Sequence, residues 1–157
     1  MGGYLKLLPL MLAVVLSLCG CGISIPTDPL HTLERVRDGH LRIGVSTNEP
    51  WVTISREGVL QGSEIDLVRS FAASVNSQIR WVHGGEESLV AAMERGELDI
   101  IAGGLTDETP WTEKAATTRP YSESTDPEGV TLKHVLLVRM GENAFLSELE
   151  KFLDGRS

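Results

Sequence analysis

Hydrophobic and polar positions in the middle of the chain follow the periods of strands and helices in turn. Leu41, Ile43 and Val45 alternate with other residue types, which predicts a first strand. From Gly62 onward apolar side chains recur at helical spacing, so we expect a helix that packs on a sheet. A nearly continuous apolar run over 98–102 is typical of a central strand covered on both faces.

Between these elements lie a second strand and a second helix. Residues 78–82 predict the strand, and Glu86 and Glu87 stand where a helix N-terminus favours carboxylates. Gly96 is a typical glycine at a helix C-terminus. Strands that alternate with helices predict an α/β fold with a mostly parallel sheet flanked by helices. A chain of 157 residues is long enough for one such domain.

The first residues have the pattern of a secretion signal. Lys6 precedes an apolar run over 7–18, which is too short to span a bilayer as a final anchor. We therefore expect residues 1–20 to be a signal peptide. Residues 21–29, rich in Gly, Ser, Thr, Asp and Pro, are expected to form a tether, and residues 30–157 the folded domain.

Two cysteines follow the apolar run and are the only ones in the chain. The segment Leu18-Cys19-Gly20-Cys21 resembles the lipobox of bacterial lipoproteins, in which a small residue precedes the cysteine that is lipidated. The resemblance implies lipidation of Cys21 and a membrane-anchored, extracytoplasmic protein. Cys19 is the competing site, although the larger Leu18 precedes it. An ordinary signal peptide with incidental cysteines is the remaining alternative.

The charge of the chain argues against polyanionic partners. The formal net charge is −8, and removal of residues 1–20 takes away Lys6, which leaves about −9. A nucleic-acid-binding surface needs a cluster of basic side chains, whereas Lys and Arg are scattered in this sequence. We therefore expect no nucleic-acid partner.

Catalytic and metal-binding patterns are not found in the sequence. The four histidines have no metal-ligand spacing, and no nucleophile elbow, phosphate-binding loop or zinc-protease helix occurs. We expect neither an enzyme nor a bound cofactor or metal.

Ligands of open α/β sheets bind outside the carboxyl ends of the strands, where loops converge. The predicted loops at these ends are 47–51, 83–87 and 103–111. The candidate ligand-binding residues in them are Asn48, Trp51, Glu86, Thr106, Asp107 and Trp111.

Several segments, taken in order, resemble the bacterial extracytoplasmic solute-binding proteins of the family that includes the polar amino-acid receptors. These segments read LRIGVSTNEPW, GSEIDLVRSFAASV, ESLVAAMERGELDIIAGGLT and TRPY. The resemblance implies a periplasmic-binding-protein-like type II fold. Pro50-Trp51 matches an aromatic that the family presents after a proline, and Leu105-Thr106 matches the start of a ligand loop. In GSEIDL, Ser63 stands where the family has an aromatic, and Asp66 is expected to be a first-turn helix carboxylate.

The resemblance also implies that one of the family's two lobes is missing. In two-lobed receptors the chain crosses into a second lobe after the Pro-Tyr motif and returns through a strand and a closing helix. Here residues 122–130 form a short acidic linker, followed directly by a strand over 133–139 and helical apolar positions over 145–153. We expect a single lobe in which this late strand runs antiparallel to the others.

The family's amino-acid receptors grip the α-carboxylate of the ligand with an arginine a few residues after the threonine that corresponds to Thr106. An ungapped alignment places Trp111 at that position, so ordinary amino-acid capture is not expected. Arg119 is the candidate substitute, although it lies just before the Pro-Tyr motif. The carboxylates and indoles of the loops favour a cationic ligand. Alternatively, the carboxylates are solvated or complement helix dipoles, and the tryptophans pack under loops.

These observations predict a lipid-anchored protein that binds a small molecule for a membrane transporter or sensor. A single lobe offers an open surface, so tight binding would need a dimer or a membrane partner to supply the opposite wall. The alternative is an accessory or signalling lipoprotein that docks a membrane protein through the same face, with Trp51 and Trp111 as anchors.

Overall fold

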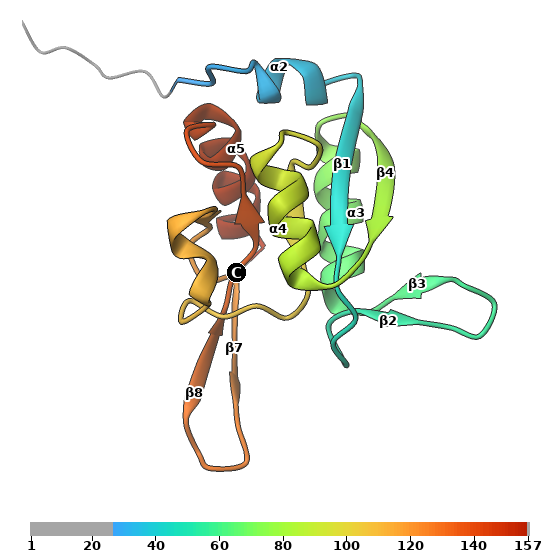
Figure 1. The fold of residues 1–157 in the computed structure, drawn as a ribbon, viewed down its shortest axis with the longest axis vertical. Helices are drawn as coiled ribbons and strands as arrows, with labels where there is room; N and C mark the ends of the chain where they lie inside the picture. The colour runs from blue at the N-terminus through green and yellow to red at the C-terminus, as the bar shows by residue number, and fades with distance from the viewer. Residues whose placement is uncertain (1–26, 157) are drawn as a thin grey trace, which may run out of the picture.

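A computed structural model describes residues 27–156, which form a five-stranded mixed sheet between layers of helices (Figure 1). The strand order is β4-β1-β5-β9-β6. The strands β4 (Gln78–His83), β1 (His40–Val45) and β5 (Ile100–Ala102) run parallel. The strand β9 (Leu137–Val138) is antiparallel to β5 and to β6 (Ala116–Thr117). The α/β class, the mostly parallel sheet and the antiparallel late strand are thereby confirmed.

Helices cover both faces of the sheet. One face packs against α2 (Thr32–Val36), α3 (Ser63–Ser74) and α5 (Asn143–Asp154). The other face packs against α4 (Glu86–Glu94). The side chains of Ile100 and Ala102 lie in the first cluster and that of Ile101 in the second, which explains why the predicted central strand is apolar throughout.

Contact between β1 and α4 depends on a glycine in the strand. A Cβ at Gly44 would lie 2.8 Å from Leu98 Cδ1 and 3.0 Å from Leu89 Cδ2. Leu41, Ile43 and Val45 project to the opposite face, toward α3 and α5. The alternation seen in the sequence therefore has apolar residues on one side and close helix packing on the other.

The segment expected as a linker after the Pro-Tyr motif forms part of a hairpin. Residues of β7 (Ser122–Thr125) pair with β8 (Thr131–His134), so the expected single strand over 133–139 is divided. Only Leu137–Val138 joins the main sheet. The two strands are separated by Val135 and Leu136. The Val135 N–H donates to Leu105 O at 2.9 Å, and the Leu136 N–H donates to Thr118 Oγ1 at 3.1 Å.

A second hairpin was not anticipated from the sequence. It consists of β2 (Thr53–Ile54) and β3 (Leu60–Gln61), and it turns at Gly58, whose φ is +80°. Both hairpins leave the body of the molecule at the end where the parallel strands have their carboxyl termini (Figure 1).

The opposite end of the molecule is closed by reciprocal contacts between α5 and the residues before α2. Asp28 Oδ1 accepts hydrogen bonds from the N–H groups of Ala144 and Phe145, at 2.8 and 3.0 Å. Glu142 in turn accepts bonds from the N–H groups of Leu30 and Thr32. The last residues of the predicted tether are thus held against the start of α5.

The expected signal peptide and the lipidation site Cys21 lie outside the described residues. Within residues 27–156 no helix is both long enough and apolar enough to cross a membrane.

Candidate functional site

Loops from three parallel strands converge between the two hairpins (Figure 1). They follow β1, β4 and β5, and comprise residues 46–51, 84–85 and 103–109. We call the surface formed by these loops and Trp111 the strand-end site. All six candidates from the predicted loops lie on it or on the elements that begin there.

The first loop is fixed to the third by the side chain of Asn48. Its Nδ2 donates to Gly103 O at 2.9 Å, and its backbone exchanges two hydrogen bonds with Val52, each 2.9 Å long. Asn48 therefore has a structural role in closing the loop that presents Trp51.

The ring of Trp51 lies over Gly104 and against His134. Its centroid is 4.5 Å from that of the His134 ring, with an angle of 37° between the ring planes. Gly104 has φ of +65°, and a Cβ there would come within 2.7 Å of Trp51 Cε3. A glycine is thus favoured by the left-handed backbone conformation and required by the position of the indole.

A buried carboxyl group lies beneath this loop pair. Glu64, on the first turn of α3, is 0% exposed and accepts hydrogen bonds from the Gly104 N–H, at 2.9 Å, and from the Tyr121 hydroxyl. Burial raises the pKa of Glu64 above its usual value, although these hydrogen bonds act in the opposite direction. The pKa of Tyr121 is also raised, because its phenol is buried and lies next to the Glu64 carboxyl group.

His134 connects the site to the β7–β8 hairpin. Its side chain is buried, and its Nε2 lies 2.8 Å from Ser124 Oγ on β7. Its Nδ1 has no hydrogen-bond partner among the described residues. Its backbone O accepts from the Tyr121 N–H at 3.0 Å, so the root of the hairpin is attached at several points.

The second indole of the site is held by a carboxylate. Trp111 lies on the short 3-10 helix η2 (Pro110–Glu113) and packs against the apolar cluster that includes α4. Its Nε1 donates to Glu86 Oε2 at 3.0 Å. Glu86 is partly buried at the N-terminus of α4. The structure therefore joins two of the predicted residues into one indole and carboxylate pair.

Thr106 and Asp107 lie where the third loop meets the hairpin. Thr106 forms an isolated bridge with His134, and the Asp107 N–H donates to Lys133 O at 2.9 Å. The side chain of Asp107 is exposed, which leaves its carboxylate open to a ligand.

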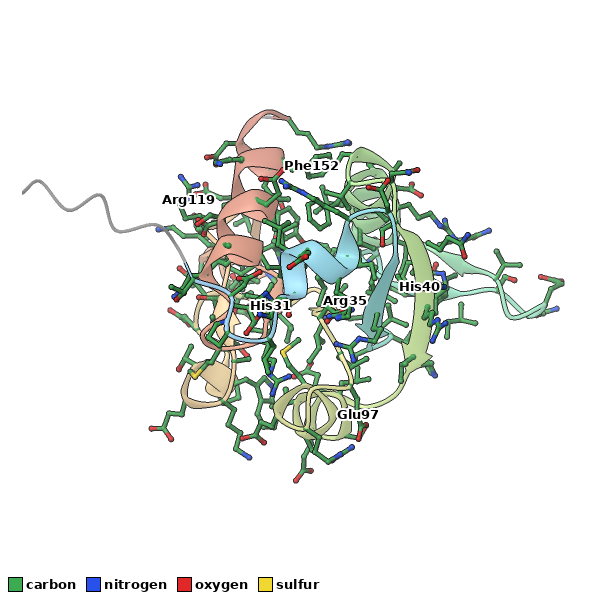
Figure 2. All side chains as sticks on the ribbon, turned by 90° about the horizontal axis from the view of Figure 1, so that it is seen from above. His31, Arg35, His40, Glu97, Arg119 and Phe152 are labelled. Carbon is green, nitrogen blue, oxygen red and sulfur yellow. The ribbon has the colours of Figure 1, made fainter. Side chains whose placement is uncertain are left out.

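Arg119 lies apart from this group. Its guanidinium contacts Glu150 at 3.2 Å and Asp154 at 2.9 Å, both on α5, and Figure 2 shows it beside that helix. The structure therefore pairs the Arg119 guanidinium with two carboxylates of α5, and its hydrogen bonds and ion pairs within residues 27–156 involve no residue of the strand-end site.

Three residues that the structure places at the centre were not predicted: Glu64, Tyr121 and His134. A signal existed for two of them, since Glu64 lies within GSEIDL and Tyr121 within TRPY. Nothing in the local pattern marks His134, which the hairpin brings to Trp51 from a distant part of the chain.

A hollow of about 770 Å³ lies at the other end of the molecule, between α5 and the segment that includes α2. We do not place the site there, because ligands of open α/β sheets bind at the carboxyl ends of the strands. Among residues 27–156 no group of three or more metal-binding side chains is found.

Comparisons with known proteins agree with the fold. The family model for bacterial extracellular solute-binding proteins, family 3, matches residues 41–156. The membrane-bound lytic murein transglycosylase F of Vibrio cholerae is 34% identical over 93 residues, which are 58% of this chain and 17% of that protein. The chain thus spans about a sixth of the length of this relative.

Solved structures of binding proteins have the same fold. The arginine-bound form of domain 1 from TmArgBP superposes with a TM-score of 0.69 and 20% identity, over 78% of this chain and 97% of that chain. A putative ABC-transporter binding component from Wolinella succinogenes, complexed with lysine, has a TM-score of 0.65 and 14% identity, over 74% of this chain and 89% of that one.

Proposed function

Because the chain belongs to the bacterial extracellular solute-binding proteins of family 3, we propose that it binds a small solute at the strand-end site, without catalysing a reaction. The observation that carries this proposal is the convergence of Trp51, Trp111 and Glu86 at the carboxyl ends of parallel strands. Convergent aromatic and polar groups at that position are typical of small-molecule sites.

A single lobe is sufficient in at least one structural neighbour. Domain 1 from TmArgBP, which this chain matches over 97% of its length, is described as arginine-bound. The opposing lobe is therefore not a requirement for ligand occupancy in that fold. We extend this to the present chain, in which the two hairpins flank the strand-end site (Figure 1).

The side chains of the site favour a cationic ligand. Trp111 donates to one oxygen of Glu86, which leaves the second carboxylate oxygen free to pair with an ammonium or guanidinium group. The exposed Asp107 adds a second negative charge, and the indole faces attract cations. The neighbours complexed with arginine and lysine support the same ligand class.

Ligand binding is expected to raise the melting temperature of the domain. A cationic solute at about 100 times its Kd adds about 2.7 kcal/mol to the free energy of unfolding. Thermal unfolding of protein lacking residues 1–20 should be measured against L-arginine, L-lysine and polyamines. Trp111→Ala should lower the affinity for the cation about tenfold and so reduce the rise in melting temperature. Trp111→Phe keeps an aromatic ring on α4 but cannot donate to Glu86, so comparison of the two variants separates the packing of the ring from its hydrogen bond.

The neighbouring carboxylate provides a matched control. Glu86→Gln should reduce binding of the cation, whereas Glu87→Gln, at an exposed position one residue further, should leave it unchanged. A full panel without any shift in melting temperature would contradict the proposed solute binding.

We further propose that Cys21 carries a lipid and holds the protein on the extracytoplasmic side of a membrane. Expressed in a bacterial host, the full chain should fractionate with membranes and incorporate labelled palmitate. Cys21→Ser should release the protein and abolish labelling, whereas Cys19→Ser should change neither. A Cys21→Ser protein that stayed in the membrane fraction would refute the anchor.

Delivery of the solute to a membrane transporter or sensor is the role we favour for such an anchored protein. The second candidate is an accessory lipoprotein that docks a membrane protein through the same surface. The two hairpins support it, because they project beyond the loops and leave strand edges free to contact a partner (Figure 1). Co-purification of one membrane protein after crosslinking, without any ligand response, would favour this candidate.

A further inference from the structure

One fully buried residue, Glu64, connects two loops of the strand-end site with the root of the β7–β8 hairpin. Its backbone N–H donates to Trp51 O at 3.1 Å. Its carboxyl oxygens accept separately, Oε2 from the Gly104 N–H at 2.9 Å and Oε1 from the Tyr121 hydroxyl. These contacts span 13, 40 and 57 positions of sequence, so they cannot arise from local structure alone.

Two of the contacted segments carry parts of the site, and the third borders it. The first presents the indole of Trp51, and the second passes under that indole at Gly104 and continues to Thr106. The third begins the β7–β8 hairpin, and its Tyr121 N–H donates to the backbone O of His134. The ring of His134 in turn packs against the ring of Trp51. The group of contacts therefore closes on itself through Trp51.

The hydrogen-bond partners of Glu64 differ in kind from those of Asp99, another buried carboxylate that links distant segments. Asp99 is paired with two arginines, whereas the hydrogen-bond partners of the Glu64 side chain are a backbone amide and a phenol. Burial of a carboxyl group without a cationic partner is unfavourable unless its hydrogen bonds are complete. An apolar side chain would fill this position without the desolvation cost, but it could not accept the hydrogen bonds from Gly104 and Tyr121.

We propose that Glu64 is a positioning residue, whose single carboxyl group fixes the turn at Gly103–Gly104 and the root of the β7–β8 hairpin relative to one another, next to the Trp51 loop that its backbone N–H holds. The shape of the solute site then depends on a residue that lies beneath it. The consequence for binding rests on the proposed solute-binding function, whereas the fixing of the loops does not.

Hydrogen–deuterium exchange resolved by residue tests the fixing of the loops directly. In Glu64→Leu we expect exchange over 103–106 and 121–124 to be at least about tenfold faster than in the parent, with β1 and β5 unchanged. Glu64→Gln should restore slow exchange, because its oxygen can accept from the Gly104 N–H and its amide can donate to the Tyr121 oxygen. Asp66→Asn, an exposed carboxylate on the same helical turn, is the matched control.

A second variant keeps the proposal testable if Glu64→Leu does not fold. Tyr121→Phe removes one of the two side-chain contacts, and should accelerate exchange over 121–124 while leaving 103–106 protected. Unchanged exchange in Tyr121→Phe, or an equal acceleration through the whole core of Glu64→Leu, would overturn the proposal.

Calorimetric titration with L-arginine tests the consequence for the site. We expect the affinity to fall about tenfold in Glu64→Leu and to recover in Glu64→Gln. Both variants keep every surface side chain of the site, so a loss of affinity reports on the positions of the loops. If the parent itself does not bind L-arginine or any other solute of the panel, the proposed function fails while the exchange result still decides the role of Glu64. Equal affinity in the parent and Glu64→Leu would refute the link between Glu64 and the site.

Discussion

Replacing Asp99 by asparagine is expected to lower the free energy of unfolding by about 3 kcal/mol at neutral pH. Its side chain is 2% exposed and bonds to both Arg35, at 2.5 Å, and Arg42, at 2.6 Å. It also accepts from the Arg42 backbone N–H at 2.9 Å. We expect the lower end of the range for a broken buried ion pair, because the two arginines retain exposed fractions of 38% and 28% and can be hydrated.

These contacts fasten three elements at the end of the sheet opposite the site. Arg35 comes from α2 and also donates to His40 O, so it bridges to the start of β1, as Figure 2 shows. Asp99 immediately precedes β5. Loss of the carboxylate charge therefore weakens the attachment of α2, β1 and β5 together.

The effect of Asp99→Asn should depend on pH in a defined direction. Burial acts to raise the pKa of Asp99, but the hydrogen bonds from Arg42 and Arg35 more than offset it, and the pKa is lowered overall. A lowered pKa contributes stability above the unfolded value of about 3.9, and this contribution is lost as the pH falls through the folded value. The parent and Asp99→Asn should thus differ fully at pH 7 and converge below about pH 4.

Urea unfolding at a series of pH values measures this difference. Glu97→Gln is the control, because Glu97 forms an exposed pair with Arg95 and its removal should leave the unfolding midpoint unchanged. A constant difference between the parent and Asp99→Asn from pH 7 to pH 3 would show that the charge of Asp99 is not the source of its effect.

Replacing Gly62 by alanine is expected to destabilise the fold by about 3 kcal/mol or more. Gly62 has φ of 122° and ψ of 166°, a conformation that is open almost only to glycine. A Cβ there would lie 2.2 Å from Trp51 O, which is backbone and cannot move aside as a side chain could. The substitution should therefore also displace the Trp51 loop and weaken ligand binding.

Gly58 is the matched control for this prediction. It has φ of +80°, but a Cβ there meets no atom within 4 Å. Gly58→Ala should consequently show only the cost of the left-handed backbone, about 1 kcal/mol. If urea unfolding gave equal losses for both variants, the close approach to Trp51 O would have no energetic effect.

The sequence predicted those elements whose side chains are patterned by burial. The alternation in β1, the helical spacing in α3 and the apolar run before the site all reflect contact with the two apolar clusters that flank the sheet, so they carry over directly into the structure. The hairpins were missed because β2, β3, β7 and β8 are short and mostly exposed. Exposed ribbons bury too little to leave a periodic pattern in the sequence.

The site was predictable at its surface and not beneath it. Reasoning from strand ends found Asn48, Trp51 and Trp111, since loops that follow strands can be located from the strands themselves. It assigned no role to Glu64, because a carboxylate on the first turn of a helix ordinarily complements the helix dipole in water. Burial of Glu64 is set by Tyr121 and Gly104, which reach it from far along the chain.

The contacts of Asp28 with the first turn of α5 determine which way the domain would face. They fix the chain at the end of the molecule opposite the hairpins (Figure 1). From Cys21 to Thr27 a fully extended chain reaches at most about 20 Å. If Cys21 is lipidated, the bilayer lies on the α2 side, and the strand-end site opens away from it, toward the aqueous compartment from which a diffusing solute arrives.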